Sequence, residues 1–371
     1  ALVVGGSVLR DAAAVERGVR IFAHMAQELF QPQGFLRERS AHYQCVVTNW
    51  LFDTLHFARA AFADRQQACA AFAALEALSL RVSSATALLI AACDGLDTQI
   101  GDISPDNHPS VAIARLRRLY PSALAGSNEQ PDWRRDDWLC VSNAKHRLLA
   151  CGLPRDYPFD YTTHGHPDLG SFIWAYDGRT ILVEAGRASY RNDACSRLQT
   201  GAAGHNVLTV QGLPPLVDSL LANGRWCPRP YAQAAINFEH KSGVGIQIRH
   251  SGFTRIPAVG NHTRAITCDD GAIAVLDELE GVGDIEIEMF WHLAPGFLPQ
   301  ENSAGIATGH GLRMTVATAG GDAGASGMHW EEYPYSAAYG DVQPAFMLRV
   351  RRNVRLPWSG RTTLQVMPCA A

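Results

Sequence analysis

The sequence reads Thr163-His164-Gly165-His166-Pro167-Asp168-Leu169-Gly170-Ser171-Phe172 near its middle, so that two histidines flank one glycine and an acid follows. In an extended segment alternate side chains share a face, and we therefore expect His164 and His166 to point into one site. A strand-like run from Ile181 to Gly186 comes next, followed by the segment Ala203-Gly204-His205-Asn206-Val207. The pattern predicts a cluster of imidazoles beside a carboxylate.

Three interpretations of this cluster stay open at this point. The histidines can satisfy polar contacts in a loop without any further role. Neutral imidazoles together with a carboxylate also suit zinc or a similar divalent ion. Proton transfer is the third interpretation, because histidine changes its charge near neutral pH. One histidine can hold an ion while its neighbour faces a substrate.

The first third of the chain has helical periodicity. Apolar residues recur at helical spacing from Leu9 to Phe30 and again from Val46 to Phe62. The segment from Ala68 to Ile90 is apolar nearly all round, which predicts a helix packed between other helices. Turn-forming residues predict breaks at 31–34, at 63–64 and from 94 to 109.

From about residue 126 the pattern changes to short β-rich runs between Gly, Asn and Asp turns. Residues 127–132 are expected to form a linker. Many strands without intervening helices indicate an antiparallel sandwich or barrel rather than a parallel sheet. The clearest predicted strands are Thr180 to Glu184, Val207 to Val210, Gly245 to Arg249, Ala272 to Leu276, Ile285 to Phe290 and Thr362 to Val366.

Composition limits the classes of function. The chain of 371 residues is 47% hydrophobic and 18% charged, which suits two folded domains with large cores. Its net charge is −4, and it has no dense run of Lys and Arg, so nucleic-acid binding is disfavoured. No stretch of about 20 apolar residues is expected to span a membrane. The oligomeric state is not predicted.

The cysteines and the first residues of the chain both bear on where the protein is located. Nine cysteines are scattered without a Cys-x-x-Cys pair, which argues against a disulfide framework and is compatible with a reducing compartment such as the cytoplasm. The chain begins Ala1-Leu2-Val3-Val4, which is predicted to lie inside a secondary-structure element that is already under way. We therefore expect that an upstream part, with any signal peptide, is absent.

Several motifs in order resemble the heparinase II/III family of polysaccharide lyases. They are His164 to Phe172, Gly178 to Gly186, Arg197 to Val210, Glu38 to Tyr43, Ile100 to Asp106, Asn261 to Arg264 and Trp291 to Leu293. The resemblance is best with bacterial members from O-antigen and capsule contexts, which favours a periplasmic location. It implies an α+β multidomain fold, with an incomplete N-terminal (α/α) toroid over 1–127 and a C-terminal antiparallel β-sandwich over 128–371.

The resemblance also implies a reaction. Such carbon-oxygen lyases cleave acidic polysaccharides by β-elimination, removing the proton on C5 of a uronate and expelling the oxygen on C4. The family pattern Glu-x-Ser-x-x-Tyr carries a catalytic tyrosine, and Glu38, Ser40 and Tyr43 match it. His164, by its matching position, is the second group for proton transfer or for neutralising charge. We therefore predict Tyr43 and His164 as the catalytic pair.

The resemblance assigns further roles around this pair. The predicted substrate-binding residues are Glu38, His42 and Arg197. Arg197 precedes His205 by eight residues, and it either pairs with an anionic sugar or braces its own loop. Asp168 is expected to orient other groups rather than to react, and Asn206 to fix a turn.

A divalent metal ion is the third implication. His166, Glu184 and His205 match the family's ligand positions, although relatives usually have Asp where this chain has Glu184. The ion is expected to be zinc, with calcium or manganese as alternatives. Its expected role is structural, so that its loss would loosen His164 rather than remove a Lewis acid.

Rival readings remain. A cupin-type metalloprotein would need the acid a few residues after the second histidine, where this chain has Leu169, Gly170 and Ser171. Family lyases also use an asparagine on an earlier helix, and Asn49 lies on the wrong side of Tyr43 to match it. A non-catalytic glycan-binding protein on the same fold is therefore the alternative function.

Overall fold

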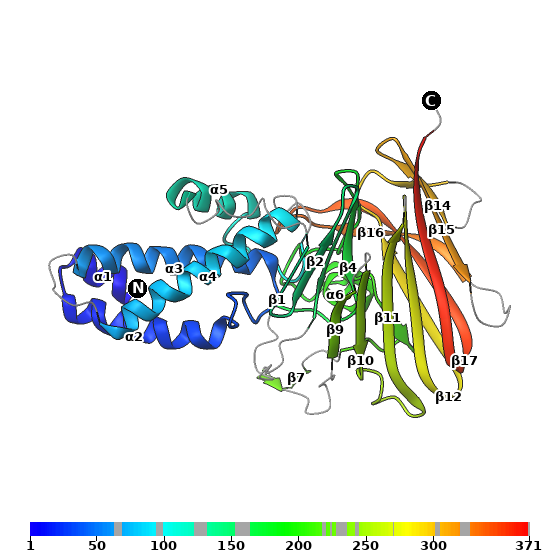
Figure 1. Ribbon diagram of the computed structural model, residues 1–371, viewed down its shortest axis with the longest axis horizontal. Coiled ribbons are helices and arrows are strands. Elements are labelled where there is room, and N and C mark those ends of the chain that lie inside the picture. The colour runs from blue at the N-terminus through cyan, green and yellow to red at the C-terminus, as the bar shows by residue number, and fades with distance from the viewer. Residues whose placement is uncertain are drawn as a thin grey trace.

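The computed structural model shows a layer of helices, a small antiparallel sheet and a large antiparallel sheet, which follow one another from left to right in Figure 1. The helices lie at the N-terminal end and the large sheet at the C-terminal end. The structure describes residues 1–62, 69–93, 99–121, 132–152, 164–216, 220–222, 225–227, 236–241, 245–269, 271–300, 305–319 and 327–369.

Several helices begin where the local sequence supplies a cap. Asp11 accepts hydrogen bonds from the backbone N–H groups of Ala13 and Ala14 at the start of α2. Pro109 occupies the first turn of α5, where its missing N–H costs nothing. The main helices are α1 (Leu2–Val8), α2 (Ala12–Leu29), α3 (Ala41–Phe62), α4 (Ala70–Ala92) and α5 (Pro109–Leu119), with the short α6 (Ala194–Thr200) and the 3-10 helix η2 (Ala202–Gly204) later in the chain.

Helix α4 confirms the prediction of an apolar helix between other helices, because it packs against α2 and α3. The expectation that no stretch is apolar enough to span a membrane needs correction. By length and composition α4 passes that test, and 56% of its most apolar window is buried inside the protein. A buried core helix passes the same test, so this finding alone establishes no membrane span.

The small sheet forms the middle layer because both of its faces are apolar. Along β2 and β3 the side chains alternate, so that Leu139 and Leu148 face the large sheet while Trp138 and Leu149 face the helices. In β4, Phe172 faces the large sheet in the same way. The strand order is β1 (Trp133–Arg135), β2 (Trp138–Ser142), β3 (His146–Cys151), β4 (Phe172–Tyr176) and β5 (Arg179–Leu182), all antiparallel.

The large sheet is antiparallel throughout and is centred on two long strands, β12 (Ala272–His292) and β17 (Gln343–Pro368). Its other strands are β6 (Leu208–Val210), β9 (Ile236–Lys241), β10 (Gly245–His250), β11 (Val259–Asp269), β13 (Leu298–Pro299), β14 (Ile306–Gly309), β15 (Leu312–Ala319) and β16 (Gly327–Tyr335). A separate hairpin consists of β7 (Leu220–Ala222) and β8 (Arg225–Cys227).

Most predicted strands are confirmed, with one correction. The predicted strands Ala272 to Leu276 and Ile285 to Phe290 are two parts of the single strand β12. The segment Gly281-Val282-Gly283, between the two predicted strands, lies at a shift in the pairing with β17. Both glycines have positive φ, which lets the strand absorb the irregularity and continue.

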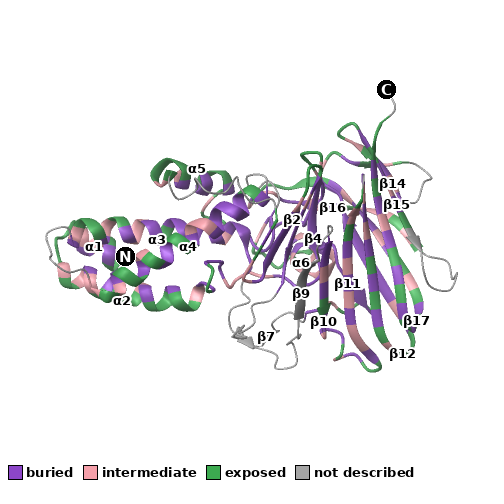
Figure 2. Cartoon of the chain, viewed as in Figure 1, coloured by how far each residue is buried: buried purple, intermediate pink, exposed green. Residues whose placement is uncertain are grey.

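The two sheets share one core, and the helices share a second core with the back of the small sheet. Figure 2 shows the buried residues concentrated along the inner faces of helices and strands, with exposed residues on the outside. The antiparallel β-rich C-terminal part is therefore confirmed, and so is the helical N-terminal part. The predicted boundary at 127/128 and most of the predicted linker lie outside the described residues, and the incomplete toroid stays a prediction.

Candidate active site

Tyr43 lies in the first turn of α3, and Ser40 explains why. The Ser40 Oγ accepts a hydrogen bond of 3.0 Å from the backbone N–H of Tyr43, as a helix-capping serine does three residues ahead. The same hydroxyl donates to the carbonyl of Asp102 at 2.7 Å. The Ser-x-x-Tyr spacing is thus a cap that fixes the turn bearing Tyr43 and ties it to the loop around Asp102.

The rings of Tyr43 and His164 stack on one another, with centroids 3.7 Å apart and an angle of 15° between their planes. The two residues come from different layers, since α3 carries Tyr43 and the loop before β4 carries His164. The structure therefore brings together the two residues predicted as the catalytic pair. Their assigned roles stay predictions.

Glu38 orients His164. The Nδ1 of His164 lies 2.7 Å from the Glu38 Oε2, and both side chains are mostly buried. A carboxylate can only accept, so in the neutral imidazole Nδ1 carries the hydrogen and Nε2 is left as the basic atom. The predicted substrate-binding residue Glu38 is thus found as the partner of His164.

His164 and His166 do not share a strand face, contrary to the expectation from their spacing. Their segment is a loop, and the following strand β4 begins only at Phe172. The ring of His164 stacks on Tyr43, while the Nε2 of His166 lies 2.8 Å from the Asp102 Oδ1. Gly165, between the two histidines, lies in the same loop. The alternation of side chains that holds in a strand therefore does not apply to this segment.

His42 and Arg197 lie differently from Glu38. His42 is fully buried in α3, and burial lowers the pKa of its imidazole to about 4, an effect that nearby His108 reinforces. This position counts against direct contact with a substrate. Arg197 is exposed on α6 and donates to the carbonyl and the side chain of Asn192, at 3.2 and 3.1 Å. These contacts support the alternative that Arg197 braces its own loop.

The predicted metal ligands meet, but not around one point. The Nδ1 of His205 contacts one oxygen of Glu184, and the Ser171 hydroxyl donates to the other. The rings of His166 and His205 are 5.1 Å apart. Among the described residues, no group of three or more His, Cys, Asp or Glu side chains is arranged to hold a metal ion.

Two details of this trio bear on the ion. The Nε2 of His205 is buried without a hydrogen-bond partner among the described residues, which suits a metal ligand. The oxygens of Glu184 are engaged, however, and burial raises the pKa of its carboxyl. In this arrangement the three side chains do not surround a common point, and binding of an ion would require the Glu184 carboxylate to release Ser171 or His205.

Three residues that the sequence reading did not select also line the site. The hydroxyl of Tyr190 lies 3.2 Å from that of Tyr43. Arg187 places its guanidinium 4.7 Å from the centre of the Tyr190 ring and pairs with Asp102 at 3.2 Å. Partial burial, with nearby Asp102 and the hydrogen bond to Tyr43, raises the pKa of Tyr190, so its hydroxyl stays protonated and can donate to the Tyr43 oxygen.

A buried network lies beneath the site. The guanidinium of Arg264 pairs with Asp277 and donates to the carbonyls of Gly170 and Asn206, at 2.9 and 2.7 Å. Asn206 in turn donates to the carbonyls of Phe172 and Val183. Asn206 was expected to fix a turn, and it joins several segments of the sandwich instead.

Asn49 is not at the site, as its place after Tyr43 indicated. It is buried in α3, where its side-chain N–H₂ donates to the carbonyls of Cys45 and Ala112.

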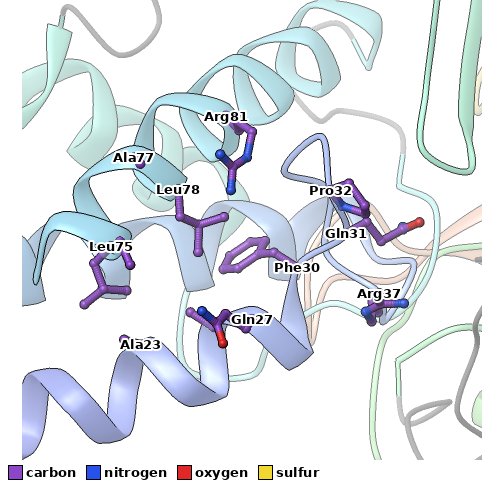
Figure 3. A pocket seen from close by; sticks show the side chains of 12 residues that line it. Ala23, Gln27, Phe30, Gln31, Pro32, Arg37, Leu75, Ala77, Leu78 and Arg81 are labelled. Carbon is purple, nitrogen blue, oxygen red and sulfur yellow. The ribbon is translucent and has the colours of Figure 1, made fainter. Parts of the chain in front are cut away.

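A cavity of about 390 Å³ lies away from Tyr43 and His164, between α2 and α4 (Figure 3). Phe30, Leu75 and Leu78 form its apolar wall, and none of the predicted site residues lines it.

Solved polysaccharide lyases share this fold. A heparinase III gene product has a TM-score of 0.70 at 12% identity, over 96% of this chain and 56% of that one. The heparan sulfate lyase HepC from Pedobacter heparinus gives 0.66 at 12% identity, over 96% and 56%. Another heparinase III structure gives 0.69 at 12% identity, over 99% and 60%. The chain thus spans little more than half the length of these proteins.

The sequence itself gives the family. The profile of the heparinase II/III-like C-terminal domain matches residues 148–362, which is more than half of the chain. The chain therefore belongs to the heparinase II/III-like family. A comparison with curated proteins gives no match.

Proposed function

We propose that the protein is a polysaccharide lyase that cleaves a uronate-containing acidic polysaccharide by β-elimination. The observation that carries the proposal is the stacked pair of Tyr43 and His164, 3.7 Å apart and held by Glu38 on one side and Tyr190 on the other. The family and the fold of heparan sulfate lyases support this class of reaction. Fold alone would not grant it.

The proposed reaction needs one base, one acid and one neutralising group. Tyr43, reacting as the phenolate, takes the proton from C5, the electron pair of the broken C–H bond forms the C4–C5 double bond, and the bond from C4 to the bridging oxygen breaks. Tyr43 then gives this proton to the bridging oxygen, so that it acts first as base and then as acid, and the reaction consumes no water. His164, reacting as the imidazolium with Nδ1 held by Glu38, donates from Nε2 to the uronate carboxylate and neutralises its charge, which makes the C5 proton more acidic. We also propose that the N-terminal helices belong to an incomplete (α/α) toroid.

The test is the ultraviolet absorbance of the unsaturated product, measured over a panel of uronate-containing polysaccharides that begins with heparan sulfate. We expect a rise with at least one polymer, no rise with a neutral polysaccharide, and no rise with His164→Ala. The variant His329→Ala is the control, because His329 lies half exposed on β16. If no uronate polymer gives a product while glycans still bind, the alternative of a non-catalytic glycan-binding protein replaces the lyase.

We also propose that a divalent ion, zinc in the first instance, binds at His166, Glu184 and His205 and holds the loop that carries His164. Metal analysis of the purified protein should then find about one ion per chain, and a chelator should lower the unfolding temperature. At an ion concentration 1,000 times its Kd, linkage predicts about 4 kcal/mol of stabilisation. His166→Ala should abolish binding. A metal-free protein that zinc does not stabilise contradicts the proposal.

A further inference from the structure

Arg39 has an unusual position for an arginine. It is 1% exposed, and its φ of 55° lies in the left-handed region that favours glycine. It stands between Glu38, the partner of His164, and Ser40, the cap of the turn bearing Tyr43. A strained backbone around a buried cation indicates that the side chain is used.

The side chain of Arg39 reaches across to the loop that carries His164. Its Nη2 forms an ion pair with Asp168, and its Nη1 donates to the carbonyl of His166 at 3.3 Å. Both partners lie within four residues of His164. Asp168 is itself 3% exposed, so this ion pair is shielded from water and salt.

The backbone segments around Arg39 are packed too closely to move independently. The backbone N–H of Asp102 donates to the His164 carbonyl at 2.9 Å. A Cβ added to Gly101 would lie 2.5 Å from the Arg39 carbonyl oxygen and 2.8 Å from that of His164. Three segments, around residues 39, 101 and 164, therefore meet at one point.

We propose that Arg39 is a positioning residue, which locks the His164 loop against the first turn of α3 and so keeps the rings of Tyr43 and His164 stacked. Its guanidinium presents several donors in one plane and serves Asp168 and the His166 carbonyl together. A lysine, with a single ammonium group, does not reproduce this arrangement. The catalytic readout of this role rests on the proposed lyase function, whereas the geometric readout does not.

The first experiment compares the kinetics of Arg39→Ala, Arg39→Lys and Asp168→Asn. We expect kcat to fall by roughly 100-fold in Arg39→Ala, as for a reacting group displaced by about 1 Å, with KM changed far less. Arg39→Lys should recover only part of this loss, and added guanidinium should restore part of the Arg39→Ala rate. Asp168→Asn keeps the shape of the site and should lower kcat in the same direction.

A destabilised control separates positioning from general loss of stability. Ile273→Ala removes part of a side chain from the core of the sandwich. Ile273 is fully buried and lies at the beginning of β12. It should lower the unfolding temperature and leave kcat unchanged. If Ile273→Ala lowers kcat as much as Arg39→Ala does, or if guanidinium restores nothing, Arg39 has no positioning role.

The second experiment reads the ring stack directly by nuclear magnetic resonance. A ring stacked at 3.7 Å shifts the imidazole protons of His164 upfield, and Tyr43→Leu gives the unshifted reference. In Arg39→Ala and Asp168→Asn we expect the signals to move toward that reference. Unchanged signals overturn the proposal. A wild-type protein that shows the upfield shift but cleaves no polysaccharide refutes the lyase function and leaves this readout intact.

Discussion

Replacing Tyr43 with phenylalanine should lower the rate of lyase product formation by roughly 100- to 10,000-fold, the usual contribution of a positioned proton-transfer group. Phenylalanine keeps the ring that stacks on His164, and it removes only the hydroxyl that lies 3.2 Å from Tyr190. The fold and the binding of polysaccharide should therefore survive. The measurement is the initial rate of ultraviolet absorbance on the best substrate of the panel.

Tyr120→Phe is the matched control. Tyr120 contacts Asp53 and Phe52 of α3 through its hydroxyl and its ring, well along the helix from the first turn. Loss of the Tyr120 hydroxyl should leave the rate of product formation unchanged. Should Tyr43→Phe keep most of the wild-type rate, the base is another group, and the stacked pair holds the site together without moving the proton.

The largest expected effect on stability belongs to Asp137, in the turn between β1 and β2. Burial raises the pKa of its carboxyl to about 7, from 3.8 in the unfolded chain, although Gln31 donates a hydrogen bond to it. Between these two values the folded protein keeps a proton that the unfolded chain has lost. Stability should therefore fall as the pH rises from about 4 to 7, by about 4 kcal/mol at 1.36 kcal/mol per pKa unit, and stay level above 7.

Asp137→Asn should remove this fall, because its amide is neutral at every pH and its oxygen still accepts from Gln31. Urea unfolding at pH 5 and pH 8 checks the prediction, and the difference between variant and wild type isolates the contribution of Asp137. Glu280→Gln, at an exposed ion pair with Arg249, is the control and should leave the wild-type fall intact. An equal fall in Asp137→Asn would show that another group titrates.

The sequence predicts the layers of this fold well, for a physical reason. Amphipathic periodicity in α2 and alternation in β10 are local properties, and each appears in the structure where it was expected. The short helix α6 was missed, because Asp193 caps only seven residues and these have no apolar period of their own. The single strand β12 was predicted as two separate strands, because its pairing with β17 is not visible in the local sequence.

The site was predicted less completely. Tyr43, His164 and Glu38 were found because a motif carries them, and the structure brings them together. Tyr190 was missed, since only the fold places its hydroxyl beside that of Tyr43. The role of Arg39 was equally hidden, although it stands inside the motif. Burial and a partner 129 residues away are consequences of packing, which spacing along the chain does not record.

The strand β17 follows both of its neighbours in the sequence, yet it lies in the middle of the large sheet, between β12 and β15. Until residues 343–368 leave the ribosome, both neighbours expose the hydrogen-bonding edges that β17 covers. Sheets with such distant pairings fold slowly, because a long loop must close before the contacts form. Synthesis of this protein therefore includes an interval in which β12 and β15 are present, β17 is absent, and association between nascent chains competes with folding.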